Sequence, residues 1–229
     1  MTLTETLPQE SIASVRFAVL GPVRVWRGDD ELDAGPPQQR ATLVQLLASA
    51  GQPVSLTELI DFLWPSDPPN FAANVVHRYI GALRRRLEPG LPSRSVGRWL
   101  VRDAGGYRLK VDADTLDLLR FRHLADQARQ AAADDRSDDA VPLFAQALNL
   151  WRGPCVAGIE SASRAYPLFT AISQERTALL QEAADSALRA GQPRAVLSIL
   201  RAAAAEDHLA EDLEPTCEAI LIALFIGNA

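Results

Sequence analysis

The side chains best suited to chemistry lie on one face of the segment 74–87, whose sequence is Asn-Val-Val-His-Arg-Tyr-Ile-Gly-Ala-Leu-Arg-Arg-Arg-Leu. At a helical rotation of about 100° per residue, Asn74, Arg78 and Arg85 share a face with two small residues. An arginine can donate two hydrogen bonds to a guanine edge, an asparagine can pair with adenine, and small residues let the helix backbone approach the bases. This face therefore suits the major groove of DNA, and its three polar residues are candidates for base contacts.

Other roles for these residues stay open. Arg78 and Arg85 are equally well explained as solvated side chains or phosphate contacts, and Asn74, near the helix start, could instead cap the helix. Most hydrogen bonds between protein and DNA go to the DNA backbone. The neighbouring and downstream basic residues are therefore candidates for backbone contacts: His77, Arg84, Arg86, Arg98, Arg102 and Arg108.

The opposite side of segment 74–87 must face a core, because apolar residues recur there at helical spacing. Two helices are expected before it. One covers residues 38–50, opened by two prolines and stopped by a glycine, and the other starts at Ser55, where Ser55 and Glu58 form a capping box. The buried stripe expected for this second helix is Leu56, Leu59, Ile60 and Leu63.

Strand patterns flank the three helices. Short alternating segments between residues 15 and 33 predict a small N-terminal sheet, and the runs 98–102 and 107–111, joined by a turn with two glycines, predict a hairpin. Three helices closed by a hairpin make a winged helix, in which the third helix enters the major groove and the wing reaches the DNA backbone. We therefore predict an α+β winged-helix domain over residues 15–112, with three helices, a short N-terminal sheet and a C-terminal hairpin wing.

The second half of the chain is rich in alanine and helical in pattern. Small residues at helix crossings, packed against large apolar residues of a neighbour, are typical of helical-repeat arrays, whose surfaces usually bind proteins. We predict an all-α, tetratricopeptide-like domain over residues 115–229, interrupted at 150–154. Its expected helices are 116–133, 137–149, 165–190, 193–205 and 213–225.

Charge is distributed unevenly along the 229 residues, whose formal net charge is −6. Residues 71–111 hold nine Arg and Lys against two acidic residues, a local charge of +7. Such a patch in an acidic protein needs an anionic partner or neutralising neighbours, and nucleic acid is the commonest such partner. We therefore expect double-stranded DNA as a partner, despite a sequence pI near 5.1.

No residue pattern indicates catalysis, a metal site or a cofactor. The three histidines are scattered, Cys155 and Cys217 lack metal-ligand spacing, and neither a nucleophile elbow nor a glycine-rich nucleotide loop is present. No run is long and apolar enough to cross a membrane, and residues 1–14 lack the features of a secretory signal. We expect a cytoplasmic, nucleoid-associated protein that is not an enzyme and has no membrane partner, with two buried thiols and a disordered leader over residues 1–14.

Six motifs follow one another along the chain: FAVLGPV at 17–23, GPPQQR at 35–40, LIDFLW at 59–64, Asn74 with LRRRL at 83–87, GGYRL at 105–109 and LWRGP at 150–154. This ordered set resembles the Streptomyces antibiotic regulatory protein family. The resemblance implies an OmpR-type winged helix followed by a bacterial transcriptional activation domain. It also implies an activator of antibiotic or other secondary-metabolite gene clusters, which binds direct repeats in promoters and recruits RNA polymerase with its sigma factor.

Further expectations follow from this resemblance. Candidates for polymerase contacts are Arg40, Trp64 and Asp67, although Arg40 could form an internal salt bridge and Trp64 could anchor the end of its helix. A homodimer, or protomers side by side on the repeats, is expected. Gly81 stands where the family often has a serine-like residue, which removes a phosphate contact. The family usually continues past position 229, so a C-terminally shortened helical domain is also expected.

Two rival functions fit the same elements. A protein-interaction adaptor would use the winged helix to bind a protein and would lack a salt-dependent affinity for DNA. A repressor would bind DNA in the same way and would never recruit polymerase.

Overall fold

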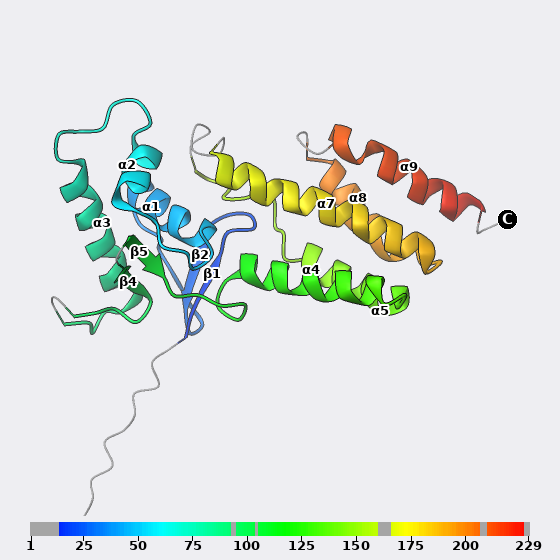
Figure 1. Cartoon of the computed structure of the whole chain (residues 1–229), viewed down its shortest axis with the longest axis horizontal. Helices are drawn as coiled ribbons and strands as arrows, with labels where there is room; N and C mark the ends of the chain where they lie inside the picture. Colours follow the sequence, from blue (N-terminus) through cyan, green and yellow to red (C-terminus); the bar gives the residue numbers. More distant parts are fainter. Residues whose placement is uncertain (1–13, 93–94, 104, 160–165, 207–209, 227–229) are drawn as a thin grey trace, which may run out of the picture.

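The computed structural model describes residues 14–92, 95–103, 105–159, 166–206 and 210–226. It shows an α+β winged helix followed by an all-α helical array, so the predicted fold class is confirmed (Figure 1). The part of the chain that the structure describes contains no helix both long and apolar enough to span a membrane.

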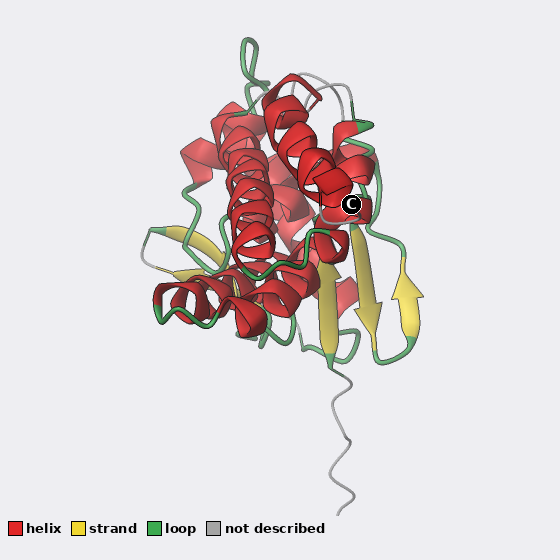
Figure 2. Ribbon diagram, turned by 90° about the vertical axis from the view of Figure 1, so that its right-hand side faces the viewer, coloured by secondary structure: helices red, strands yellow, loops and turns green. Residues whose placement is uncertain are grey.

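Within the described residues, the winged-helix half is built from two antiparallel sheets and three helices. The first sheet has the strand order β1-β2-β3, and β4 pairs with β5 to form the wing. Figure 2 shows the three-stranded sheet at one side of the view and the hairpin at the other. The elements are β1 (Val15–Ala18), β2 (Arg24–Arg27), β3 (Asp30–Leu32), α1 (Pro37–Ala48), α2 (Leu56–Leu63), α3 (Ala72–Leu87), β4 (Leu100–Asp103) and β5 (Gly106–Leu109).

The predicted capping box opens α2. The Glu58 N–H donates to the Ser55 hydroxyl at 3.1 Å, and the Ser55 N–H donates to the Glu58 carboxylate at 2.7 Å. Hydrogen bonds from Ser55 to the carboxylate, the backbone N–H first, lower the pKa of Glu58, because they favour its charged form. The box thus satisfies two backbone donors that a helix start would otherwise leave without a partner.

A glycine lets the wing pack against the helices. Val54 and Tyr107 exchange two backbone hydrogen bonds of 2.8 Å, which join the loop before α2 to β5. A Cβ atom on Gly106 would collide with the carbonyl oxygen of Val54, and the backbone of Gly106 has a φ of +154°. Only glycine therefore allows the hairpin to lie this close to the loop.

Antiparallel helices build the second half (Figure 1). α4 packs along α5, α5 packs against α7, and α9 covers α8 and part of α7. Two bidentate ion pairs, Arg122 with Glu175 and Arg129 with Glu182, tie α4 to α7 one heptad apart. The helices are α4 (Asp117–Ala133), α5 (Ser137–Leu148), α7 (Pro167–Arg189), α8 (Arg194–Ala204) and α9 (Ala210–Ile226).

The two halves share one continuous hydrophobic core. Phe62 of α2 is buried and packs edge-on against Tyr166 and Phe169 of the helical half, with ring centroids 5.2 and 5.7 Å apart. The sequence analysis missed Phe62, because the predicted stripe of α2 served only the winged helix. In the structure Leu59 and Phe62 are the buried residues of α2, and the other three predicted positions are only partly buried.

Two smaller predictions and one open alternative were wrong. α3 begins at Ala72 after Phe71, so Asn74 lies inside the first turn and does not cap the helix. Cys217 is only half-buried, whereas Cys155 is buried as predicted. The strands of the wing are shorter than expected, so Arg98 precedes β4. The predicted leader lies outside the described residues, apart from its last residue, Ser14.

Candidate nucleic-acid interface

α3 presents the predicted polar face to solvent. Its apolar side is buried at Val76, Ile80, Leu83 and Leu87, which fixes the rotation of the helix on the core. Asn74, His77, Arg78 and Arg85 are all exposed. The structure thus brings the three candidates for base contacts together on one exposed helix face.

A shallow hollow of about 590 Å³ lies on this face of α3. Gly81 and Ala82 lie between the longer side chains of Arg78 and Arg85 that also line it. A Cβ atom on Gly81 would lie 3.7 Å from Nη1 of Arg85, an ordinary contact, so the fold itself does not require glycine there. The absence of a side chain at position 81 therefore leaves the backbone of α3 open to close approach.

The arginines of α3 divide into two kinds. Arg84 donates through Nε to the carbonyl of Leu100 at 2.9 Å, which ties α3 to β4. Arg86 donates to the Asp33 carbonyl at 2.9 Å and forms an ion pair with its carboxylate at 3.2 Å. Over the described ranges, neither Arg78 nor Arg85 makes an ion pair or a side-chain hydrogen bond with the protein. Their guanidinium groups are available to a ligand.

Tyr79 fixes the other flank of α3, because its hydroxyl donates to the side-chain carbonyl of Gln38 in α1. On the wing side, the ring of His77 lies edge-on to Tyr107, with centroids 6.2 Å apart. Together with Arg84 and Arg86, these contacts hold α3 at fixed positions relative to α1, the wing and the loop after β3.

The wing carries three arginines in different settings. Arg102 is exposed on β4. Arg108 pairs with Asp103 at 3.2 Å across the hairpin, and Arg98 lies over the Trp99 ring, 5.5 Å from its centroid. Arg102 is therefore the wing arginine best placed to contact a phosphate.

The candidates for polymerase contacts lie in different settings. Arg40 donates to the carbonyl of Gly35 at 3.2 Å and lines a small cleft of about 110 Å³ with Leu63 and residues 158–159 of the helical half. The internal salt bridge considered for it does not form with any residue that the structure describes. Trp64 is half-buried at the end of α2, packed against the core, and Asp67 is exposed in the loop between α2 and α3.

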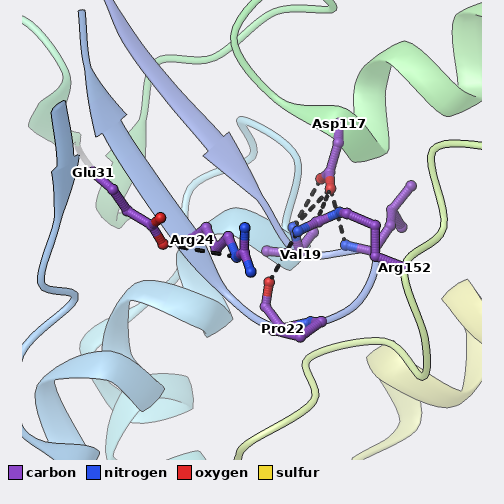
Figure 3. A network of polar contacts seen from close by, with 7 residues as sticks. Val19, Pro22, Arg24, Glu31, Asp117 and Arg152 are labelled. Carbon is purple, nitrogen blue, oxygen red and sulfur yellow. Dashed lines mark hydrogen bonds and ion pairs between the residues drawn. The ribbon is translucent and has the colours of Figure 1, made fainter. Parts of the chain in front are cut away.

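Asp117, the first residue of α4, joins the helical half to the N-terminal sheet (Figure 3). Its carboxylate accepts hydrogen bonds from the N–H groups of Val19, at 2.8 and 3.0 Å, and Leu20, at 3.1 Å. It also pairs with Arg152 at 2.9 Å, and Arg152 donates to the Pro22 carbonyl at 3.4 Å. We call these five residues the junction clasp. Burial raises the pKa of Asp117, against the opposite effect of the two N–H groups and Arg152.

Two of the motifs noted in the sequence meet at this clasp. Arg152 donates its backbone N–H to the carbonyl of Leu20 at 2.8 Å, and Ala157 donates to Gly21 at 3.0 Å. Gly21 has a φ of +135°, and a Cβ there would lie 2.9 Å from Cβ of Arg152. The motifs at 17–23 and 150–154 therefore belong to one contact between the two halves. The sequence analysis missed the clasp because it treated each motif separately.

Comparison with protein families gives two adjacent matches. Residues 33–109 match the family described as the C-terminal domain of transcriptional regulatory proteins, and residues 116–226 match the bacterial transcriptional activator domain. Neither family is catalytic. The two matches cover the winged helix from β3's end to β5 and the whole helical array.

Named relatives are regulatory proteins. Over 218 residues the chain is 36% identical to the regulatory protein AfsR of Streptomyces coelicolor, which covers 95% of this chain and 21% of that protein. It is 32% identical over 186 residues to the transcriptional regulatory protein MoaR1 of Mycobacterium tuberculosis, covering 80% and 59% of the two chains. The chain thus spans about a fifth of one relative and about three fifths of the other.

A solved structure shares the architecture. EmbR of Mycobacterium tuberculosis, determined in complex with a low-affinity phosphopeptide, superposes with a TM-score of 0.77 at 28% identity. The match covers 92% of this chain and 55% of that one. The arrangement of a winged helix followed by a helical activator domain is therefore shared along nearly the whole chain.

Proposed function

Because the chain belongs to the Streptomyces antibiotic regulatory protein family of transcriptional regulators, we propose that it activates a secondary-metabolite gene cluster, such as one for an antibiotic. In this proposal it binds direct repeats in promoter DNA, as a homodimer or as protomers side by side, and recruits RNA polymerase with its sigma factor. Its place of action is the cytoplasm, on the nucleoid.

The contrast between the arginines of α3 supports this proposal. Arg84 and Arg86 donate to protein carbonyls, whereas Arg78 and Arg85 lie exposed beside a hollow with a small-residue floor. An exposed guanidinium can pair with both acceptors of a guanine edge. We therefore propose Arg78, Arg85 and Asn74 as base contacts.

The remaining basic residues are proposed as contacts to the DNA backbone. Arg102 is exposed on β4, and His77 lies at the edge of the α3 face next to the wing. Arg84 and Arg86 have a second role, since their hydrogen bonds to β4 and Asp33 set the position of α3. The set of backbone contacts is His77, Arg84, Arg86, Arg98, Arg102 and Arg108.

Selection of bound sites from random duplex DNA tests base reading. The expected result is an enriched direct repeat whose affinity falls steeply with salt, by a log–log slope of about 0.9 per phosphate contact. Arg78→Ala and Arg85→Ala should each weaken binding by about 1–3 kcal/mol and relax the preference at one base pair. Arg136→Ala removes the same charge from the helical half and is the matched control, so it should change neither the affinity for DNA nor the base preference.

Site selection and in-vitro transcription together separate the rival functions. Equal weakening on all DNA sequences would assign Arg78 and Arg85 to phosphates, and no enrichment with a flat salt response would favour the adaptor. In-vitro transcription from the selected site should rise on adding the protein, and a fall would favour the repressor.

Asp67→Ala should reduce this rise in transcription without changing DNA affinity if the α2–α3 loop contacts polymerase. Arg40 and Trp64 are the other proposed polymerase contacts and are tested in the same way.

A further inference from the structure

A cationic cleft of about 690 Å³ lies between the N-terminal sheet and the start of the helical half. We call it the junction cleft. Its walls come from β1, β2, residues 113–117, the first turn of α4 and residues 149–152, and none of its lining residues belongs to α3 or the wing. The side chains that matter are Arg16, Arg24, Trp26, Arg120, Asn149 and Arg152.

All four arginines of the junction cleft are exposed, and two are held only loosely. Arg24 lies 3.7 Å from Glu31, and both side chains are about half exposed, at 49% and 53%. Arg120 lies 4.0 Å from Asp114, whose side chain is 90% exposed. Exposed ion pairs of this kind contribute little to the free energy of folding. These two guanidinium groups can therefore turn to a ligand at small cost.

The acidic residues of the cleft do not cancel this charge. Asp114 and Asp117 line it, and Glu31 lies beside Arg24, so three carboxylates stand against four arginines and leave an excess of one positive charge. The carboxylate of Asp117 already accepts the backbone N–H groups of the junction clasp, and only 13% of that side chain is exposed. The cleft therefore attracts anions.

We propose that the junction cleft binds a small phosphate-bearing ligand of nucleotide size. Planar guanidinium groups match phosphate oxygens in a bidentate way, and a ligand with several such oxygens can bridge more than one of them. The volume falls within the usual range for small-molecule sites. Trp26, over whose ring Arg16 lies 5.8 Å from the centroid, and the amide of Asn149 also line the cleft and suit the non-phosphate part of such a ligand.

The four arginines of the junction cleft come from both halves of the chain. Arg16 and Arg24 belong to the winged-helix half, and Arg120 and Arg152 to the helical half. A phosphate group held between them bridges the two halves beside the junction clasp. Ligand binding therefore stabilises the folded, docked arrangement, because a ligand that binds only that state raises its unfolding temperature.

Calorimetric titration and thermal melts of the full chain, with ADP and with inorganic pyrophosphate as probes, test the proposal. We expect saturable binding and a higher melting temperature at constant ionic strength. The double variant Arg24→Ala/Arg120→Ala should bind both probes at least about tenfold more weakly, a loss of about 1.4 kcal/mol. Neither residue belongs to the clasp, so this variant should fold, as circular dichroism would verify.

The double variant Arg78→Ala/Arg85→Ala is the matched control, since it removes the same charge from α3 and should leave probe affinity unchanged. Absence of saturable binding at millimolar concentration would overturn the proposal. So would a loss of affinity in the α3 variant alone, which would place the anion on the DNA-reading face. An equal loss of DNA affinity in the cleft variant would instead make these arginines DNA contacts. DNA selection and probe titration are independent, so either proposal can fail without the other.

Discussion

Replacing Asp117 with alanine should destabilise the protein strongly for a single residue near the surface. The carboxylate is the hydrogen-bond acceptor for the N–H groups of Val19 and Leu20, and both residues are 0% exposed. Without it, two backbone donors are left in the interior with no partner. The two halves of the chain also lose the ion pair between Asp117 and Arg152.

The magnitude follows from these contacts. A buried backbone donor without a partner costs about 1–3 kcal/mol, so two such donors cost about 2–6 kcal/mol. Removing a carboxylate whose pKa is raised by burial offsets part of this loss. The side chain of Arg152 is 34% exposed, so water can hydrate its guanidinium group when Asp117 is removed. The loss of this ion pair therefore adds little to the decrease in stability. The expected decrease in the free energy of unfolding is about 2–4 kcal/mol.

Urea denaturation followed by tryptophan fluorescence and circular dichroism measures this decrease. Asp114→Ala is the matched control, because Asp114 lies three positions earlier, 90% exposed, in an ion pair of 4.0 Å. It should cost less than about 0.5 kcal/mol. Asp117→Asn keeps one acceptor oxygen and should fall between the two. Equal stability of Asp117→Ala and Asp114→Ala would refute the assigned role of the junction clasp.

Three other predictions concern single sites. Gly81→Ala should raise the free energy of unfolding by up to about 1 kcal/mol, because the added Cβ has room on the helix, whereas Gly106→Ala should lower it by about 3 kcal/mol or more. Melting temperatures of both variants equal to that of the unchanged protein would contradict these predictions. Burial raises the pKa of Cys155 to about 12, so a thiol reagent at pH 8 should label Cys217 first and Cys155 only on unfolding; simultaneous labelling would be evidence against this burial. The lowered pKa of Glu58 means that its contribution to stability is present above its ordinary pKa of 4.5 and is lost as the pH falls through the lower folded-state value. Glu58→Gln should therefore flatten the acid side of the stability curve, and an unchanged acid limb would show that the capping box is not responsible.

Local patterns were enough to predict the elements. Alternation located the strands of the first sheet, the capping box placed the start of α2, and alanine-rich periodicity located the helices of the second half to within a few residues. These signals depend on neighbours in the sequence, so no knowledge of the tertiary structure was needed. The predicted polar face of α3 also depends on a single helix, and the structure exposes it as expected.

Features that depend on distant residues were not predictable in this way. Phe62 is buried by Tyr166 and Phe169, more than a hundred positions later, so the periodicity of α2 alone could not identify it. Asp117 looked like an ordinary acidic residue at a helix start. Its partners in the winged-helix half are backbone N–H groups, which have no side-chain signal, and its other partner, Arg152, lies 35 positions later. Helical position separated Arg78 and Arg85 from Arg84 and Arg86 in the sequence, but it could not show that Arg84 and Arg86 donate to backbone carbonyls of the protein.

The contact of Phe62 with the helical half has a consequence for the proposed complex with promoter DNA. Because α2 supports α3 and also packs on Tyr166 and Phe169, the helical half would turn with α3 around the axis of a duplex that α3 binds. B-form DNA repeats about every 10.5 base pairs. Shifting a binding site by about half of that repeat would carry the helical half to the opposite side of the DNA. A shift by a full repeat would restore the side. Under the proposed recruitment of polymerase, functional binding sites would thus lie a whole number of helical turns from the polymerase. A flexible connection between the two halves of the chain would remove this constraint.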